Sequence, residues 1–295
     1  MLSLHTNSAT LSAQNSISRT NSRLSNSMTR LGTGYRVNSA MDDAAGLQIA
    51  TRLRAQTSGM SMAMRNTQNS ISMIQTADGA LDETTAILVR MKDLATQAAD
   101  GSATDPDRTA MQSEYDALTD ELTNIVSNTS FGGTTLLSSK ADSKFLVAIN
   151  FQIGSAETEV MTQDLSAQLA TMHTNLTATN SGHVFSADGT VGAGAGTAIA
   201  TADSANDMIT ALNTGIESVS NVRSSLGAAA NRLDHVYQNL SNMVNNTKNA
   251  SGRIMDVDFA DESATMMSSQ MLLQAGTAML KQSNSQSSLV LSLLQ

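Results

Sequence analysis

Two adjacent carboxylates stand in the middle of the stretch RVNSAMDDAAGLQIATRLRAQ. Paired aspartates can bind a metal ion or serve as a catalytic acid and base. Ser39 precedes Asp42 by three residues, which approximates a capping box with Asp in place of Glu or Gln. Both Asp42 and Asp43 would then lie in the first turn of a helix that begins near residue 40, where the helix dipole favours negative charge. We therefore interpret the pair as structural, and we expect Gly46 to allow the close approach of another backbone.

Two other motifs resemble ligand-binding loops but are incomplete. The stretch VGAGAGT has Thr197 where a dinucleotide-binding loop needs its third glycine, and no buried strand leads into it. The stretch DVDFADE has carboxylates at the spacing of a calcium loop, but Ala260 stands at a ligand position and Asp261 where glycine is required. The chain has no cysteine and its four histidines are scattered. We predict no catalytic, cofactor-binding or metal-binding site, and no enzymatic activity.

The composition is typical of long helices with narrow apolar stripes. The 295 residues include no Trp, five Phe, three Tyr and one Pro. The net charge of -9 argues against nucleic-acid binding, yet residues 1–77 carry seven Arg and only two Asp, while acidic residues cluster at 256–262. Either the two ends attract each other or neighbouring copies, or they are two solvated faces. No apolar run reaches the length of a membrane span, and the first thirty residues lack the apolar core of a signal peptide.

Large apolar residues recur at steps of six or seven near both ends of the chain. In the N-terminal arm these residues are Leu4, Leu11, Ile17, Leu24 and Leu31. In the C-terminal arm they are Phe259, Met266, Leu273 and Leu280. Each set predicts one apolar stripe along a helix. Because Ser, Asn and Thr fill the other faces of the N-terminal arm, we expect it to become ordered only when something covers its stripe.

The interior of the chain predicts a helical rod with a small β region. Heptad spacing of Ile74, Leu81 and Leu88 predicts a helix over about 58–98, and a second helix follows the turn DGSATDPDR to form a hairpin. Alternation from Phe145 to Ile153 predicts a half-buried strand. One heptad position of the last long helix contains Leu212, Val219, Leu226, Leu233 and Leu240. The other contains Ile209, Ile216, Ala230, Tyr237 and Val244.

The predicted fold is mainly α, with long coiled-coil-like helices from both ends of the chain and a small β region near 131–165. The order of elements is almost palindromic, so we expect the first and last segments to pack together. Three parts are predicted: an inner coiled-coil domain of 1–42 and 255–295, a helical rod of 43–176 and 206–254, and a short variable surface loop at 177–205.

Four stretches carry a resemblance to the bacterial flagellin family. They are LGTGYRVNSAMDDAAGLQIATRLRAQ, VRMKDLATQAADG, NVRSSLGAAANRLDHVYQNLSNMVNN and QMLLQAGTAMLKQSNSQSSLVLSLL, which lie in the family's order. The chain is similar to a short form that lacks large outer domains, as in some lateral flagellins. The resemblance implies a structural subunit that polymerises into the flagellar filament for swimming or swarming. The alternative it leaves open is a hook-filament junction protein of the same system.

The resemblance also implies partners and sites. The terminal arms would be disordered in the free monomer and would pack together in the filament. Export would proceed through the flagellar type III apparatus with its chaperone, without a cleaved signal peptide, to an extracellular tip that carries cap and hook-junction proteins. Ser39, Asp42, Asp43 and Gly46 would form the joint between the inner domain of the terminal arms and the helical rod. The contacts that many flagellins make with a vertebrate Toll-like receptor correspond here to Arg90, Leu94 and Glu114. Neither a cofactor, nor nucleic acid, nor a membrane is expected.

Overall fold

The computed structural model describes residues 8–179, 185–190 and 196–293. They form two compact units. The arm unit comprises the described residues up to Thr57 and from Asn245 onward, and the rod unit comprises Ser58–Val244. The division of the assembled protein into inner domain, rod and variable loop stays a prediction.

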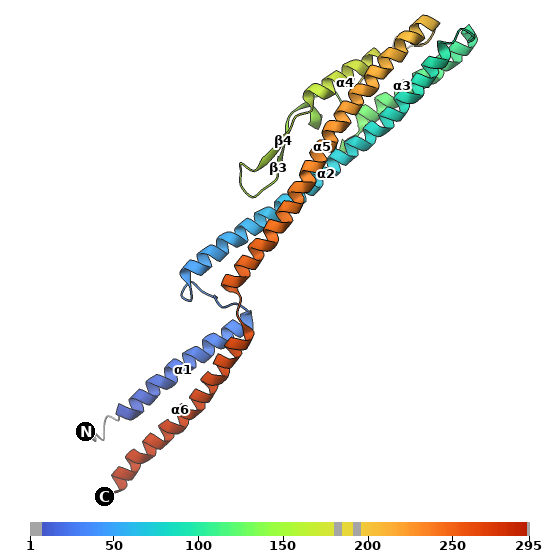
Figure 1. Cartoon of the computed structure of the whole chain (residues 1–295). Helices are drawn as coiled ribbons and strands as arrows, with labels where there is room; N and C mark the ends of the chain where they lie inside the picture. The colour runs from blue at the N-terminus through green and yellow to red at the C-terminus, as the bar shows by residue number, and fades with distance from the viewer. Residues whose placement is uncertain (1–7, 180–184, 191–195, 294–295) are drawn as a thin grey trace. The chain divides into compact units, whose positions relative to one another are not determined.

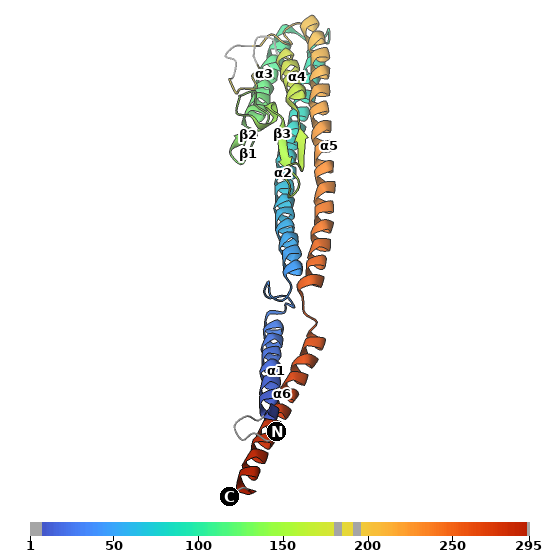
Figure 2. The same cartoon turned by 90° about the vertical axis from the view of Figure 1, so that its left-hand side faces the viewer.

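The described chain is mainly α, as predicted from the sequence. Its helices are α1 (Ser8–Thr33), α2 (Ala44–Ala98), α3 (Asp105–Asn128), α4 (Ser166–Ala178), α5 (Ala202–Met255) and α6 (Phe259–Leu293). In the arm unit, α1 and α6 lie side by side in both views (Figures 1 and 2). In the rod unit, α2 and α5 run alongside each other, with α3 and α4 near the end of α2 and the start of α5.

The β region consists of two short antiparallel pairs. Strands β1 (Ser130–Phe131) and β2 (Thr134–Thr135) are joined by Gly132 and Gly133, whose φ angles of 60° and 83° favour glycine. Strands β3 (Ile149–Gln152) and β4 (Val160–Gln163) pair with Ile149 opposite Gln163.

The predicted strand from Phe145 to Ile153 is therefore too long at its start. Phe145 lies in the 3₁₀ helix η1 (Lys144–Leu146), and Val147 is exposed. The hydroxyl of Ser143 donates to the carbonyl of Leu136 at 2.8 Å, which anchors the turn that begins η1. Phe145 lies in this 3₁₀ turn, and its side chain is buried in the core. The apolar alternation before Ile149 therefore does not correspond to a strand.

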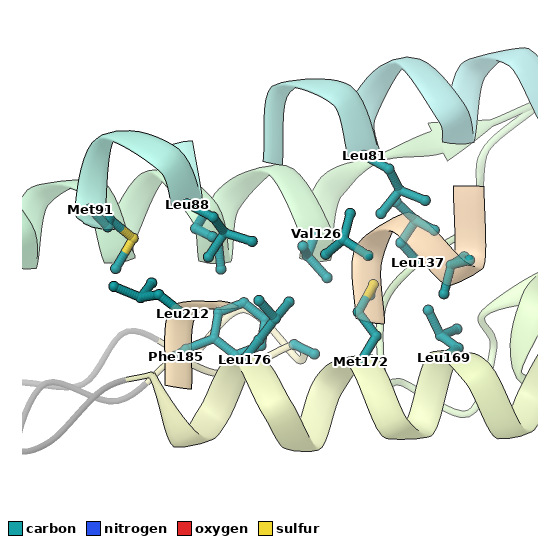
Figure 3. Packing of buried hydrophobic residues seen from close by; sticks show 14 of the residues in the cluster. Leu81, Leu88, Met91, Val126, Leu137, Leu169, Met172, Leu176, Phe185 and Leu212 are labelled. Atoms are coloured by element: carbon teal, nitrogen blue, oxygen red, sulfur yellow. The ribbon is translucent and has the colours of Figure 1, made fainter. Parts of the chain in front are cut away.

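The rod unit has one large apolar core. Figure 3 shows Leu81, Leu88 and Met91 of α2, Val126 of α3 and Leu212 of α5 directed toward a common interior, together with Leu169, Met172 and Leu176 of α4. The predicted heptads of α2 are confirmed, because Ile74, Leu81 and Leu88 are all buried. The predicted set that begins at Leu212 is buried as well. Helix α4 was not anticipated.

The second predicted heptad position of α5 lies at the edge of the covered side: Ile209, Ile216 and Ala230 are partly buried against the rod core, and Val244 is buried. The buried residues outside the leucine positions include the neighbours Met208, Gly215, Val222 and Ala229. A Cβ at Gly215 would lie 3.4 Å from Thr179 Cγ2 and 3.7 Å from Leu176 Cδ2, so this side of α5 faces the end of α4. Near Gly215, α4 therefore covers the side of α5 next to the predicted position, and α4 was absent from the prediction.

The prediction of a surface loop at 177–205 is wrong for much of its described part. Phe185, Ala198 and Ile199 are buried in the rod core, and α5 already begins at Ala202. Gln112 Oε1 accepts the backbone N–H of Ile199 at 2.7 Å, and Asp116 Oδ2 accepts that of Gly196 at 2.9 Å. These side chains of α3 hold the segment against the core.

Candidate functional site

The two arm helices form an antiparallel pair. Near one end, the hydroxyls of Thr10 and Ser283 are hydrogen-bonded at 3.1 Å. Seventeen residues further along α1, the hydroxyl of Ser27 donates to Oε1 of Glu262 at 2.5 Å. The chain therefore returns along the path by which it left, as the palindromic order of elements predicted.

The contact between α1 and α6, which we call the arm seam, follows steps of three and four. In α1 its members are Thr10, Ala13, Ile17, Thr20, Leu24, Ser27 and Leu31. In α6 its members are Glu262, Met266, Ser269, Leu273, Gly276, Leu280 and Ser283. Apart from Thr10 and Glu262, large residues occupy one heptad position and small residues the other, which lets the two backbones approach closely. A Cβ at Gly276 would lie 2.8 Å from Cγ1 of Ile17.

Only some of the residues predicted to pack in the arms lie in the seam. Leu24, Leu31, Met266, Leu273 and Leu280 lie in the seam and are half-buried. Leu4 lies outside the described residues. The prediction of a single stripe is wrong at Leu11, which is 61% exposed, and Phe259 is exposed as well.

The error at Leu11 comes from the step of six residues between it and Ile17. A heptad counted back from Ile17 reaches Thr10, which is the residue that lies in the seam. The small seam residues were also missed, because Ser, Thr and Gly resemble surface residues when each is considered alone. Their spacing of seven was the available signal: Ala13, Thr20 and Ser27 in α1, and Ser269, Gly276 and Ser283 in α6.

One charged residue lies at a seam position. The side chain of Glu262 is 12% exposed and accepts from Ser27, while its Oε2 lies 3.5 Å from Nη1 of Arg30. A carboxylate removed from water needs such partners. These contacts favour the register in which Ser27 and Arg30 face Glu262.

The paired aspartates have two separate structural tasks. The prediction that both lie in the first turn of a helix is wrong. Helix α2 begins at Ala44, and Oδ1 of Asp43 accepts the backbone N–H of Gly46 at 2.8 Å, so Asp43 is the N-cap. Asp42 precedes the helix. Its Oδ2 accepts the backbone N–H groups of Asn38 at 3.1 Å and of Ser39 at 2.9 Å.

The same hydrogen bonds explain the electrostatics of this turn and the role of Gly46. The backbone N–H of Ser39, followed by that of Asn38 and the hydroxyl of Ser39, lowers the pKa of Asp42 below its usual value. A Cβ on Gly46 would lie 2.3 Å from Oδ2 of Asp43. Gly46 therefore makes room for the capping carboxylate, rather than for another backbone as we had expected.

The segment that precedes this turn is hydrogen-bonded to the segment that joins α5 to α6, within the arm unit. The backbone N–H of Arg36 donates to the carbonyl of Met255 at 2.6 Å, and that of Val257 donates to the carbonyl of Gly34 at 3.0 Å. Nη2 of Arg36 adds a bond to the carbonyl of Ile254 at 2.7 Å. These bonds join the segment after α1 to the segment before α6.

The three residues matched to receptor contacts do not share one surface. Arg90 and Glu114 are exposed and form an ion pair, with Arg90 Nε 2.9 Å from Glu114 Oε1. Leu94 is 3% exposed and belongs to the rod core.

Metal sites and membrane-spanning helices were also searched for among the described residues. They contain no group of three or more His, Cys, Asp or Glu side chains arranged to hold a metal ion. None of the helices in the described part of the chain is both long and apolar enough to cross a membrane.

Family models match both helical ends of the chain. Residues 4–142 match the bacterial flagellin N-terminal helical region, and residues 209–294 match the bacterial flagellin C-terminal helical region. A flagellin of Halalkalibacterium halodurans is 37% identical over 269 residues, which cover 91% of this chain and 90% of that protein. A flagellin of Bacillus subtilis is 38% identical over 311 residues, with 98% of each chain covered.

A solved structure shows the same fold in a more distant protein. A chain provisionally named a flagellar hook-associated protein, from Vibrio parahaemolyticus, aligns with a TM-score of 0.56 and 16% identity, and covers 73% of this chain and 100% of that one. At this identity the likeness shows the fold alone, so it does not favour the hook-filament junction alternative. The two family models and the two flagellins show that this chain belongs to the bacterial flagellin family, the structural subunits that polymerise into the extracellular flagellar filament used for motility.

Proposed function

We propose that the arm seam and the surfaces beside it drive polymerisation of this chain. The supporting observation is that Leu24, Leu31, Leu273 and Leu280 remain half-buried when α1 and α6 have only each other as neighbours. Burial of the remaining apolar area between copies would contribute about 25 cal/mol per Å². The free monomer lacks that contribution, so the arms are disordered before assembly and become ordered within the filament.

Removal of residues 256–295 tests this role of the arms. The truncated chain should stay a soluble monomer when filament seeds are added, as measured by light scattering and electron microscopy. A point variant keeps the chain intact: Leu273→Glu places a charge in the seam and should abolish elongation. Its matched control, Leu273→Met, keeps an apolar side chain of similar volume in the seam and should elongate normally. Long filaments formed by the truncated chain or by Leu273→Glu would refute the proposal.

We also propose that the turn before α2 is the joint between the inner domain, residues 1–42 with 255–295, and the rod. Ser39, Asp42, Asp43 and Gly46 are held together by the hydrogen bonds and close contact described above. Loss of both carboxylates in Asp42→Ala/Asp43→Ala should alter the helical shape of the filament. Electron microscopy measures pitch and curvature directly, and filaments identical to wild type would remove this role.

The chain is proposed to leave the cell unfolded through the flagellar export apparatus and its chaperone, without cleavage of a signal peptide, and to fold beneath the filament cap above the hook-junction proteins. The absence of cysteine supports this route, because a chain without disulfides can pass through the apparatus unfolded. Mass spectrometry of purified filaments should recover the first tryptic peptide, which ends at Arg19. A new N-terminus between Met1 and Arg19 would contradict uncleaved export.

Recognition by a vertebrate Toll-like receptor is proposed to depend on Arg90 and Glu114, since both are exposed while Leu94 lies in the core. Charge reversal in Glu114→Lys should weaken receptor activation in reporter cells. Glu83→Lys, which changes an exposed residue of α2, is the matched control. Equal activity of both variants would exclude the Arg90–Glu114 surface. Asp42 and Asp43 hold turn and cap hydrogen bonds, and the family consists of structural subunits, so we propose no catalytic activity and no cofactor for this chain.

A further inference from the structure

The tripeptide Ala-Asp-Gly occurs three times in the chain, at residues 77–79, 99–101 and 187–189. An aspartate followed by glycine can close into a cyclic succinimide when the glycine nitrogen attacks the carboxyl carbon of the aspartate. Glycine favours this reaction because it has no side chain to hinder the attack and its backbone adopts many conformations. The three tripeptides are identical, so a difference in their reactivity comes from the structure around them.

Helix α2 restrains the first Asp-Gly pair. Gly79 lies in the interior of this helix, where its N–H takes part in the hydrogen bonding of the backbone. Oδ1 of Asp78 also accepts from Nε of Arg223 at 3.0 Å. Ring closure would have to rotate the backbone at Asp78 out of its helical conformation and break these bonds, so we expect this pair to react slowly.

Hydrogen bonds restrain both reacting groups of the third pair. The N–H of Gly189 donates to the carbonyl of Ser186 at 3.0 Å. The carboxylate of Asp188 accepts the backbone N–H of Thr190 at 2.9 Å and its hydroxyl at 2.7 Å. The hydroxyl of Ser186, followed by the hydroxyl and the N–H of Thr190, lowers the pKa of Asp188 to about 2. Because water must leave from the carboxyl group, a carboxylate that is held in its ionised form reacts slowly.

The second pair, Asp100 and Gly101, lies in the turn between α2 and α3, and both residues are exposed. Among the described residues, no backbone carbonyl accepts the N–H of Gly101. The carboxylate of Asp100 accepts from the hydroxyl of Ser102. The pKa of Asp100 is lowered chiefly by that hydroxyl and by the N–H of Ser102, and to a smaller extent by the N–H of Gly101, which therefore lies beside the carboxylate. The attacking nitrogen is thus near its target and is not restrained by a helix or a turn carbonyl.

We propose that Asp100 is a site of spontaneous conversion to isoaspartate in the folded chain. The nitrogen of Gly101 attacks Cγ of Asp100 and loses its proton, and one carboxyl oxygen leaves as water to form the succinimide. Water then adds to the ring carbonyl that came from the main chain, and the bond from that carbonyl to nitrogen breaks. The main chain now passes through Cγ, and the former main-chain carbonyl becomes a free carboxylate. The reaction needs no oxidant, reductant or enzyme.

The product rearranges the turn that joins α2 to α3. The carbonyl of Asp100 accepts the N–H of Ala103 at 3.1 Å and Nη2 of Arg108 at 3.2 Å. Conversion adds one carbon atom to the main chain and moves this carbonyl onto a side branch, so both hydrogen bonds are displaced. Arg108 also donates to the carbonyl of Ala98 at 3.0 Å, at the end of α2. We therefore expect the backbone amides of this turn to exchange faster after conversion.

The proposal is tested by prolonged incubation of the full-length monomer at neutral pH, below its unfolding temperature. An endoproteinase that cleaves before aspartate does not cleave before isoaspartate, so mass spectrometry of the digest follows each pair separately. Cleavage before Asp100 should be lost several-fold faster than cleavage before Asp78 or Asp188. In urea, which removes the surrounding structure, the three rates should become similar. Equal rates in the folded chain would overturn the inference, and so would an excess at Asp100 that persists unchanged in urea.

Matched glycine variants test whether Gly101 supplies the nucleophile. A Cβ at Gly101 would meet no atom within 4 Å, so Gly101→Ala should fold normally while its methyl group slows conversion of Asp100 several-fold. The control Gly79→Ala also places its Cβ in open space and should leave the rate at Asp100 unchanged. A Gly101→Ala chain that converts as fast as wild type would contradict the proposal. All of these measurements use the monomer, so they are independent of the proposed role of the arms in polymerisation.

Discussion

The arm unit and the rod unit are built from the same heptad pattern, yet they bury it to different extents. In the rod, Leu81 and Leu212 lie under covering elements on several sides and are fully buried. In the arm, Leu24 and Leu273 sit between only two helices and stay half-buried. A helix pair covers one side of each partner, whereas α3, α4 and the loops close the core of the rod. The apolar core of the rod is therefore covered within one chain, whereas the apolar residues between α1 and α6 stay partly exposed.

The largest expected effect comes from a cavity in the rod. Leu212→Ala should lower the free energy of unfolding of the monomer by about 2–5 kcal/mol, because a fully buried leucine loses its contacts and leaves a void. Urea unfolding followed by circular dichroism measures this loss. The arm counterpart, Leu24→Ala, should leave the urea midpoint of the monomer unchanged and slow elongation instead. A monomer equally destabilised by both variants would show that the arm is already a closed core.

The difference between the units explains how far the sequence could predict the fold. The leucines at heptad spacing predicted α2, α5 and α6, because a period of seven is a property of the chain itself. Burial of Ser27 or Gly276 depends on which helix faces it, so the same residue types looked like surface. Phe185 and Ile199 were assigned to a surface loop, yet both are buried, and Ile199 is held by Gln112 of α3, which is distant in sequence. The candidate site was predicted at its large residues and missed at its small ones.

The hydrogen bonds that capture this loop give the second expected effect. Gln112→Leu would leave the buried N–H of Ile199 without an acceptor and remove a bond of 2.8 Å to Asp116. The expected cost is about 1–3 kcal/mol in the free energy of unfolding. Hydrogen exchange of residues 196–201 should accelerate as well. The control Ser113→Ala changes an exposed residue on the same helix and should stay within about 0.5 kcal/mol of wild type.

The N-cap of α2 provides a smaller effect, confined to the arm unit. Asp43→Ala leaves the N–H of Gly46 without its capping acceptor, at a cost of about 1 kcal/mol to the start of the helix. Hydrogen exchange in assembled filaments should therefore be faster over residues 44–50, while exchange in the rod stays the same. Asp43→Asn retains a capping oxygen and should restore most of the protection. Faster exchange throughout the rod would mean that the two units do not respond separately.

The smallest effect is expected at a polar contact on the surface of the rod. Arg223 lies 3.0 Å from Asp78 through Nε and 2.8 Å from Asp82 through Nη1, and both carboxylates are largely exposed. Arg223→Met should therefore reduce stability by only about 0.2–1 kcal/mol, and the difference should shrink in high salt. Arg232→Met, on the exposed side of the same helix, is the control. A large loss that persists in salt would mean that the aliphatic stem of Arg223 packs against the rod core and helps to cover it. The rod core would then depend on a surface side chain for its closure, and its contrast with the arm would be smaller than described above.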